Sequence, residues 1–350
     1  MGEFSICIIT KNEADNLDKC LGALSTLGME IVVADTGSTD NSVEVARKYT
    51  EAVYFFEWCN DFAAARNFVA GKASSDNILM VDTDEFLTKM DMCTILEQIR
   101  SNPGKVGRIQ RINLFTREDE QVRCFEYVNR FYNRKLFEYR GTIHEQLVSI
   151  MGGNFETFEM DISFEHVGYE GTAEQIMNKT ERNIRLLLKE HEDMPDDPYI
   201  IYQLGKSYYM RGDYENAYLW LKKATYIDLD IRLEYVVDLI ISYGYSMINT
   251  ARAEEALGLE GLFDELGDIA DFDFLMGLIY MKNALFTEAV SMFLNAAKKK
   301  ECQISGVNSY KAFYNIGVIY ECLGYPKEAL KYYDMCGNYA KALDRKKELR

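Results

Sequence analysis

Short apolar runs alternate with amphipathic segments over the first 100 residues, and polar residues follow each run. Strands are expected at Phe4–Thr10, Glu30–Ala34, Val53–Glu57 and Ile78–Val81. Helices are expected at 14–27, 41–49, 62–72 and 92–101. This alternation implies βαβ units and a largely parallel sheet. From about 105 to 165 the pattern becomes strand-rich.

The fourth apolar run leads directly into the acidic residues Asp82, Asp84 and Glu85. In an extended segment residues i and i+2 point the same way, so Asp82 and Asp84 can both face the crevice where open α/β sheets bind ligands. Carboxylate oxygens suit Mg²⁺ or Mn²⁺. The run therefore predicts a divalent metal that holds a nucleotide diphosphate. The alternative is a polar strand end with a helix cap.

Other polar residues are expected at the same edge of the sheet. Thr10-Lys11-Asn12-Glu13 follows the first strand, and Asp35 with Gly37-Ser38 follows the second. An acid in this position can accept from a base N–H or a ribose hydroxyl, and a glycine allows close backbone approach. The alternative role of Asp35 is to cap a turn.

Arg66 lies on the helix that precedes the acidic strand, and arginine suits bidentate recognition of anions. The alternative partner of Arg66 is Asp61, on the surface of the same helix.

The chain has three histidines. Two of them, His144 and His166, stand near glycines and are candidates for the same site, with a satisfied core position as the alternative. His191 lies between Glu190 and Glu192 and is expected to be a solvated surface residue.

From about residue 173 the chain is expected to be helical and to repeat. The pattern around Gly205 recurs around Gly277 and Gly317, with aromatic and small residues at matching offsets. It resembles the tetratricopeptide pattern of helix pairs, with a generic helical solenoid as the alternative. A divergent unit is expected at 231–266. The repeats either present a concave face to a peptide or protein, or serve as a platform for a homodimer or for stability.

Charge and cysteine usage narrow the functional classes. The net charge of −17 disfavours nucleic acids and anionic membranes as partners. The stretch from 100 to 140 is locally basic, and its Arg130 and Arg134 are expected to border an acceptor, with a solvated hairpin as the alternative. Eight cysteines without regular spacing predict reduced thiols and a cytoplasmic location. No apolar run is long enough to span a membrane.

The first 170 residues resemble the family 2 glycosyltransferases with the GT-A fold. The resemblance is carried by six ordered motifs: Ser5–Glu13, Ile31–Asp40, Trp58–Asn67, Ile78–Glu85, Gly141–Glu145 and His166–Tyr169. The order is similar to a branch in which the transferase domain precedes tetratricopeptide repeats, a branch that glycosylates bacterial peptides, flagellins and surface glycans. The expected fold is thus α/β, a Rossmann-like GT-A domain at 1–170, followed by a linking helix at 171–194 and an all-α repeat solenoid at 195–350.

The resemblance also implies roles for single residues. A UDP-sugar would be held by Thr10, Asn12, Glu13, Asp35, Gly37, Ser38, Arg66, Asp82 and Thr83. Asp84 and His166 would bind Mn²⁺ or Mg²⁺, with Asp82 assisting the metal or holding the ribose. Glu145 would be the catalytic base, but the usual family form at this position is Glu-Asp and here it is His144-Glu145. The division of labour between these two residues stays open. Glu85 is expected to support the site or to cap.

The implied reaction is an inverting transfer of a hexose or N-acetylhexosamine from a UDP-sugar to a protein or peptide side chain or a surface glycan. Two alternatives stay open. One is a repeat-based binding scaffold that carries an inactive transferase domain. The other is a nucleotidyltransferase, although the loop at Lys11-Asn12-Glu13 lacks the glycines which that activity would need.

Overall fold

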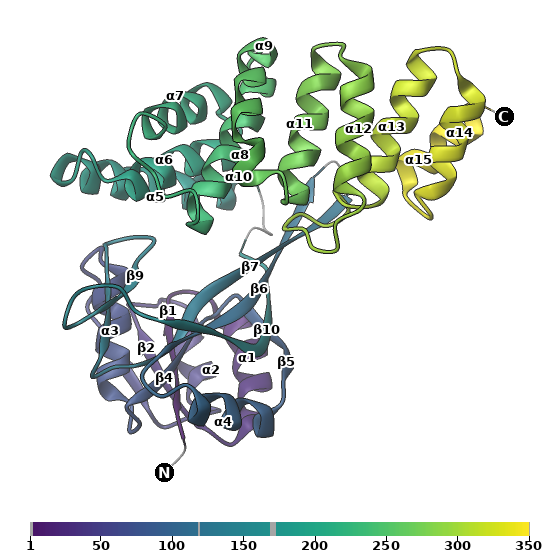
Figure 1. The fold of residues 1–350 in the computed structure, drawn as a ribbon. Helices are drawn as coiled ribbons and strands as arrows, with labels where there is room; N and C mark the ends of the chain where they lie inside the picture. The colour runs from purple at the N-terminus through teal and green to yellow at the C-terminus, as the bar shows by residue number, and fades with distance from the viewer. Residues whose placement is uncertain (1–2, 118–119, 169–172, 350) are drawn as a thin grey trace. The chain divides into compact units, whose positions relative to one another are not determined.

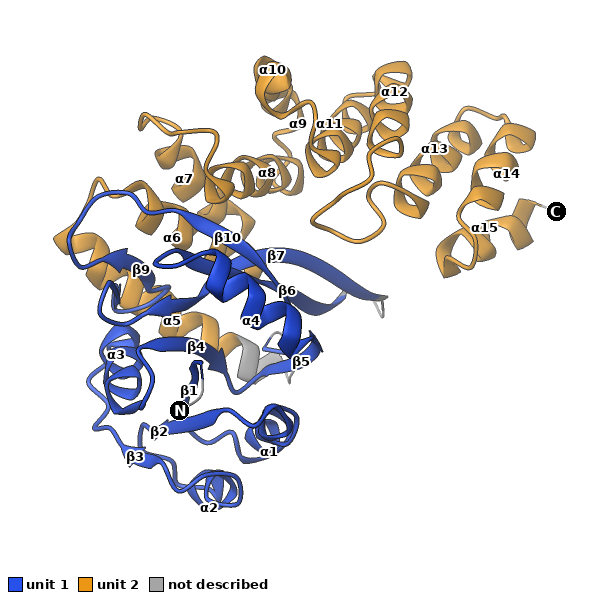
Figure 2. Cartoon of the chain, turned by 60° about the horizontal axis from the view of Figure 1, so that its bottom comes forward, with its two compact units in different colours: residues 1–176 blue, residues 177–350 orange. Residues whose placement is uncertain are grey.

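The computed structural model describes residues 3–117, 120–168 and 173–349 of the chain. The chain divides into two compact units, residues 1–176 and 177–350 (Figure 2). The division falls within helix α5 (Ala173–Asp193), in the segment expected as a linking helix. The expected boundary at residue 170, and Tyr169 of the last motif, lie outside the described residues.

The first unit combines an eight-stranded sheet with helices (Figure 1). Its strands are β1 (Ser5–Thr10), β2 (Glu30–Asp35), β3 (Val53–Phe55), β4 (Asn77–Asp82), β5 (Glu85–Met90), β6 (Val106–Arg117), β7 (Glu120–Asn133), β8 (Phe137–Arg140), β9 (Gln146–Ser149) and β10 (Thr157–His166). Its helices are α1 (Ala14–Leu24), the 3₁₀ turn η1 (Ser25–Leu27), α2 (Ser42–Ala46), α3 (Phe62–Lys72) and α4 (Met92–Ser101).

The order of strands in the large sheet is β3-β2-β1-β4-β7-β6-β10-β5. The first four are parallel to one another, whereas β7 runs antiparallel to β4 and β6, and β10 runs antiparallel to β5. Strands β8 and β9 form a separate antiparallel pair. The parallel half places the carboxyl ends of β1, β2 and β4 at one edge, where ligand sites form in sheets of this kind.

Apolar side chains cover both faces of the sheet. On one face, Leu17 and Leu21 of α1 and Ile95 of α4 pack with Ile6, Val33 and Val81. On the other face, Val69 and Ala70 of α3 pack with Cys7, Val32 and Met80. Consecutive residues of one strand thus enter opposite cores, which explains why β1, β2 and β4 read as continuous apolar runs.

The predicted α/β class is confirmed, with corrections to single elements. Helix α3 spans the expected residues, and α4 does too. Helix α2 is shorter than expected and ends at Ala46. Strand β5 was missed, because its apolar and polar residues follow directly on an acidic run that reads as a loop.

The second unit is helical throughout its described residues, as predicted. Its elements are α6 (Pro198–Met210), α7 (Tyr214–Ala224), α8 (Glu234–Asn249), α9 (Ala253–Ala256), η2 (Leu257–Leu262), α10 (Phe263–Leu266), α11 (Ala270–Lys282), α12 (Phe286–Ala296), α13 (Tyr310–Cys322), α14 (Pro326–Met335) and α15 (Ala340–Leu349).

The repeated glycines mark the crossings between paired helices. A Cβ on Gly205 would lie 2.5 Å from Leu221, one on Gly277 2.6 Å from Phe293, and one on Gly317 2.5 Å from Tyr333. Only glycine therefore lets α6 and α7, α11 and α12, and α13 and α14 approach so closely. In the divergent unit the second helix is broken into α9, η2 and α10.

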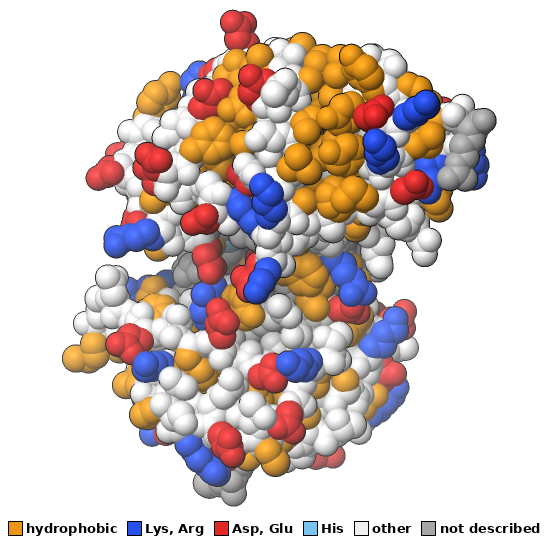
Figure 3. Space-filling model, turned by 45° about the vertical axis from the view of Figure 1, so that its right-hand side comes forward, with side chains coloured by type: hydrophobic (Ala, Val, Ile, Leu, Met, Phe, Trp, Pro, Cys, Tyr) orange, Lys and Arg blue, Asp and Glu red, His pale blue; other side chains and the backbone are white. Residues whose placement is uncertain are grey.

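The surface of the helical unit carries apolar side chains in groups (Figure 3). Near the carboxyl end of the chain, Leu323, Tyr325, Met335 and Leu343 are exposed. None of the helices in the described ranges is both long and apolar enough to cross a membrane.

Candidate functional site

The ends of three parallel strands bring the predicted nucleotide-binding residues together. Thr10 at the end of β1 pairs in register with Asp35 at the end of β2, and Ile9 pairs with Asp82 at the end of β4. Thr10 and Asp35 are 3% and 5% exposed. Among the described residues, the hydroxyl of Thr10 is one of the buried side-chain groups without a hydrogen-bond partner.

Asp35 shapes the turn that follows β2. Its carboxylate accepts from the backbone N–H of Gly37 at 3.1 Å and of Ser38 at 3.2 Å, so the turn-capping role is present. Gly37 has a φ of 97°, and no described heavy atom lies within 4 Å of the place where a Cβ would stand. The turn therefore requires a glycine and leaves its backbone open.

The loops after β1 and β2 are tied to each other. Asn12, at a φ of 53°, donates its backbone N–H to Oγ of Ser38 at 2.9 Å and accepts from the backbone N–H of Thr39 at 2.7 Å. Glu13 donates its backbone N–H to Oγ of Ser42. Thr83 is buried just beyond β4. The hydrogen bonds of Asn12 and Glu13 thus join the loops after β1 and β2 into one rim.

Arg66 connects the end of β4 to Glu145, the last residue of the Gly141–Glu145 motif. From α3 it reaches Oδ1 of Asp82 through Nη2 at 2.8 Å and donates through Nε to Oε1 of Glu145. It is 5% exposed, and its guanidinium lies over the ring of Tyr139. Asp61, the alternative partner, instead caps α3 by accepting from the N–H of Ala64.

A second arginine completes the surroundings of Asp82. Arg130 of β7 donates through Nη2 to Oδ2 of Asp82 and to Oε1 of Glu85, the latter at 3.0 Å. Burial by itself would raise the pKa of Asp82, but Arg130 and then Arg66 outweigh it and hold the pKa far below the usual range. Asp82 is therefore ionised at neutral pH, as are its two partners.

Glu85 supports the strand end, in line with the expectation from the sequence. It is fully buried and accepts from the backbone N–H of Asp82 at 3.0 Å. Because Arg130 also contacts Asp82, one guanidinium holds the carboxylates of both Asp82 and Glu85. Glu85 therefore stabilises the conformation of the acidic turn after β4.

Asp84 and His166 are neighbours, because His166 at the end of β10 pairs in register with Glu85 at the start of β5. Oδ2 of Asp84 lies 3.4 Å from Nε2 of His166, and the carbonyl of Asp84 accepts from the N–H of Val167 at 3.0 Å. His166 is 7% exposed. A Cβ on Gly168 would collide with both Nε2 of His166 and Oδ2 of Asp84. Gly168 thus keeps a space clear beside the pair.

These two side chains have the chemistry of a Mn²⁺ or Mg²⁺ site. Donors around one such ion, at about 2.1 Å from it, stand roughly 3 Å apart, close to the separation of Asp84 and His166. Within the part of the chain that the structure describes, however, no group of three or more His, Cys, Asp or Glu side chains is gathered to hold a metal. Asp82, predicted as a third ligand, is not gathered with the pair, because Arg66 and Arg130 engage its two oxygens.

The sequence pattern did not predict the residues that contact His166 on its Nδ1 side. Nδ1 of His166 is 2.6 Å from Oδ1 of Asn113 on β6, and Asn113 donates through Nδ2 to Glu126 on β7. Arg111 also donates to Glu126, through Nε at 2.9 Å. The available signal was the spacing of Arg111 and Asn113, two polar residues that share one strand face.

Arg134 donates through Nη1 to the carbonyls of Ala70 and Ala73 at the end of α3, and its side chain is 24% exposed, so its place beside an acceptor stays a prediction. One expectation about another residue was wrong. His191 is half-buried rather than solvated, with its ring 5.1 Å from that of Trp220. His144 lies next to Glu145 with a φ of 50°, a strained conformation for a residue with a side chain.

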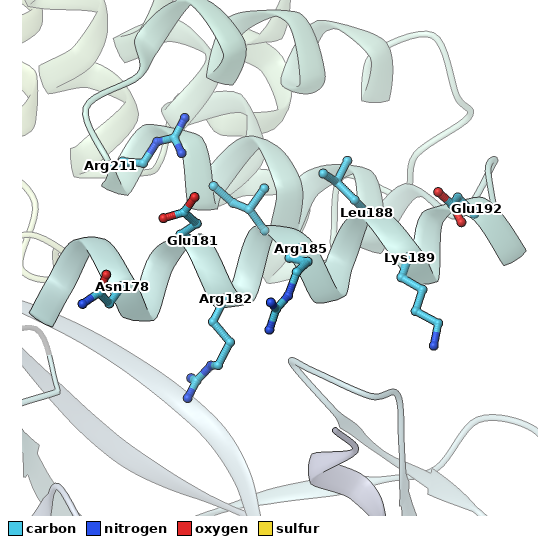
Figure 4. A pocket seen from close by; sticks show the side chains of 9 residues that line it. Asn178, Glu181, Arg182, Arg185, Leu188, Lys189, Glu192 and Arg211 are labelled. Atoms are coloured by element: carbon cyan, nitrogen blue, oxygen red, sulfur yellow. The ribbon is translucent and has the colours of Figure 1, made fainter. Parts of the chain in front are cut away.

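The helical unit has an open groove of about 870 Å³ on α5. The side chains of Arg182, Arg185 and Lys189 line this groove and project from one side of α5 (Figure 4). None of the residues that line the groove is a predicted site residue.

Comparisons with known proteins agree with the two units. Residues 5–160 match the family model described as Glycosyl transferase family 2, and residues 198–231 and 310–348 match a tetratricopeptide repeat model. The SPbeta prophage-derived glycosyltransferase SunS of Bacillus subtilis is 25% identical over 321 residues, which are 87% of this chain and 73% of that protein. A TPR repeat-containing protein of Synechococcus elongatus is 29% identical over 235 residues, 64% of this chain and 56% of that protein. Among solved structures, S. aureus TarS 1-349 is 14% identical with a TM-score of 0.38, covering 85% of this chain and 91% of that one.

Proposed function

Because residues 5–160 are a glycosyl transferase family 2 domain joined to tetratricopeptide repeats, we propose that this glycosyltransferase is metal-dependent, uses a UDP-sugar and inverts the anomeric centre. The acceptor we propose is a protein or peptide side chain or a surface glycan. The transferred group is a hexose or an N-acetylhexosamine.

The observation that carries this proposal is the pair formed by Asp84 and His166, with Gly168 leaving space beside it. The pair stands just beyond the end of β4, next to the edge that holds Thr10 and Asp35. A bound divalent ion would supply positive charge for the diphosphate leaving group.

The rim residues support recognition of the nucleoside. The carboxylate of Asp35 accepts hydrogen bonds from two backbone N–H groups, and a carboxylate can accept about four hydrogen bonds. Capacity therefore remains for a uracil N–H or a ribose hydroxyl. The hydroxyl of Thr10, which is buried without a hydrogen-bond partner, belongs to the residue that pairs in register with Asp35. We assign Asn12, Glu13, Ser38 and Thr83 to the same binding surface, and Asp82 to the ribose.

Glu145 is the proposed base. Arg66 holds its carboxylate on the same guanidinium that holds Asp82, so the base has a fixed position relative to the strand end. Glu145 takes the proton from the acceptor hydroxyl or thiol as the acceptor oxygen or sulfur attacks the anomeric carbon. One displacement with one base inverts that carbon.

The helical unit is proposed to hold the acceptor. Its helices α6 and α8 place two partly exposed charged groups together, because Lys206 pairs with Asp238 at 2.7 Å, and the buried Tyr202 donates to the same carboxylate at 2.6 Å. Such a surface suits a peptide with polar side chains. A homodimer through the repeats is the competing role, and the cytoplasmic location stays a prediction.

The experiment is a thermal shift of the full chain with UDP and Mn²⁺, each alone and together. We expect a rise in Tm only when both are present, its loss in Asp84→Ala, and its retention in the control Asp15→Ala, which changes an exposed carboxylate of α1. No shift in the wild-type chain would favour the inactive scaffold.

A second experiment tests the base. Glu145→Gln keeps an oxygen for Arg66 but cannot take a proton, so we expect transfer to fall by about 10²- to 10⁴-fold while UDP affinity is nearly unchanged. Turnover is measured by mass spectrometry of the acceptor after a screen of mass-tagged UDP-sugars. Turnover comparable to wild type would move the base role to His144 or to the acceptor itself.

A further inference from the structure

Asn113 and His166 occupy matched positions on the neighbouring parallel strands β6 and β10. Oδ1 of Asn113 lies 2.6 Å from Nδ1 of His166. The two residues are 4% and 7% exposed, so water does not compete effectively for this contact. The other ring nitrogen, Nε2, is the atom that faces Asp84.

The partner on the far side of Asn113 decides which way its amide points. Asn113 contacts Oε1 of Glu126, and the same oxygen accepts from Nε of Arg111 at 2.9 Å. Burial would raise the pKa of Glu126, but Arg111 and then Asn113 outweigh it, and the pKa lies below its usual range. Glu126 is thus ionised at neutral pH and can only accept.

The orientation of the amide then sets the protonation of the imidazole. Since an ionised carboxylate only accepts, the amide NH₂ of Asn113 must face Glu126 and its oxygen must face His166. An amide oxygen also only accepts, so Nδ1 of His166 must carry a hydrogen. A neutral imidazole has one N–H, and its lone pair is then on Nε2.

We propose that Asn113, oriented by Glu126, is a positioning residue that fixes the Nδ1–H tautomer of His166 and directs its Nε2 lone pair, together with Oδ2 of Asp84, at a divalent cation. This inference rests on the metal dependence in the proposed function. Residues that orient a metal-binding histidine in this way typically change metal affinity by about 10- to 100-fold when they are removed.

The first test reads the tautomer directly. The chain has only three histidines, so long-range ¹H–¹⁵N spectra of the metal-free full chain resolve them, and His166→Gln assigns the signal. We expect the pattern of an Nδ1–H ring in wild type and a shift towards Nε2–H in Asn113→Leu. An Nε2–H ring in the wild-type chain would overturn the proposal.

The second test is Mn²⁺ affinity by titration calorimetry without any sugar nucleotide. Asn113→Leu should weaken Mn²⁺ binding by about 10- to 100-fold. The control Asn133→Leu removes a half-buried amide of β7 that bonds Asn77 and does not touch His166, and it should bind Mn²⁺ as wild type does.

A paired exchange separates positioning from mere loss of packing. In Asn113→Asp/Glu126→Gln the carboxylate stands at position 113 and the amide at position 126, so the group that faces Nδ1 still accepts. This double variant should recover most of the Mn²⁺ affinity lost in Asn113→Leu. Wild-type binding together with unchanged affinity in Asn113→Leu would refute the role of Asn113 alone. A wild-type chain that binds no Mn²⁺ would instead refute the metal dependence, and the positioning role with it.

Discussion

Arg66 and Asp82 form a buried ion pair, with Nη2 of the arginine 2.8 Å from Oδ1 of the aspartate. The pair fastens α3 to the end of β4. Because the same arginine also reaches Glu145, one guanidinium connects the strand end with the proposed base.

Replacing Arg66 with Met should be strongly destabilising. The change leaves the carboxylates of Asp82 and Glu145 short of a buried partner, and breaking such a pair costs about 3–5 kcal/mol. The measurement is the free energy of unfolding in urea. Arg47→Met, at an exposed position of the same unit, is the control and should stay within about 0.5 kcal/mol. If Arg66→Met lowers the free energy of unfolding no more than the control does, water must solvate Asp82 and Glu145 in place of Arg66.

The pKa of Asp82 predicts a dependence of stability on pH. Its folded-state pKa is depressed, below the value of about 3.9 expected in the unfolded chain. The stabilisation is then complete above that unfolded value and is lost as the pH falls through the folded one. Urea unfolding between pH 7 and pH 3 should show stability that declines below about pH 5. The variant Asp82→Asn should be less stable at pH 7, but its free energy of unfolding should fall less steeply below about pH 5 than that of wild type. An equally steep fall in both proteins would contradict this.

Gly168→Ala should weaken metal binding without unfolding the protein. The added methyl group would collide with Nε2 of His166 and Oδ2 of Asp84, so these atoms must move apart. The readout is Mn²⁺ affinity, which we expect to fall by about tenfold or more. Gly71→Ala provides the matched control, since no described heavy atom lies within 4 Å of the added Cβ in α3. Equal affinities in the two variants would show that Gly168 does not border the ion.

Gly277→Ala should loosen the crossing of α11 and α12. The new methyl group would lie 2.6 Å from the ring of Phe293, and overpacking of this kind costs about 1–3 kcal/mol. Thermal unfolding measures the loss, with Gly258→Ala in η2 as the control, where no described heavy atom lies within 4 Å. Phe293→Leu should cost less in the Gly277→Ala background than alone, since contacting residues couple. If the destabilisations of the two substitutions simply add, the methyl group at position 277 does not clash with Phe293.

The strand ends were predictable because they depend on local patterns. Alternating apolar runs give a parallel sheet, and a parallel sheet gathers Thr10, Asp35 and Asp82 at one edge whatever the details of packing. The i, i+2 rule placed Asp82 beside Asp84, but Asp82 is held by Arg66 and Arg130 and shares Arg130 with Glu85. The glycines of the repeats were recognisable for the same reason, since each has its partner sixteen residues later on the next helix.

The pairings of the buried charges could not be predicted in this way. Arg66 meets Glu145 across 79 residues, and Asn113 meets His166 across 53. The contact of Arg66 joins a helix to the loop between β8 and β9, which no local pattern relates. The contacts of Asn113 depend on the register of β6 with β10 and of β6 with β7, which includes irregular steps between Glu159 and Ser163 and between Gly107 and Arg108. A single-residue shift in register turns a side chain to the other face of a sheet, so the hairpin pattern alone left these partners undetermined.

The position of β10 has a consequence for how the protein is made. His166 is the last residue of the last strand of the first unit, and that strand inserts between β6 and β5, both of which are synthesised long before it. At about 5–20 residues per second, a ribosome needs roughly 4 to 16 seconds to go from Asp84 to His166. During that interval the nascent chain has Asp84 but not its histidine. The pair of Asp84 and His166 therefore forms only when β10 completes the sheet, and a nascent or truncated chain that stops short of β10 cannot form it.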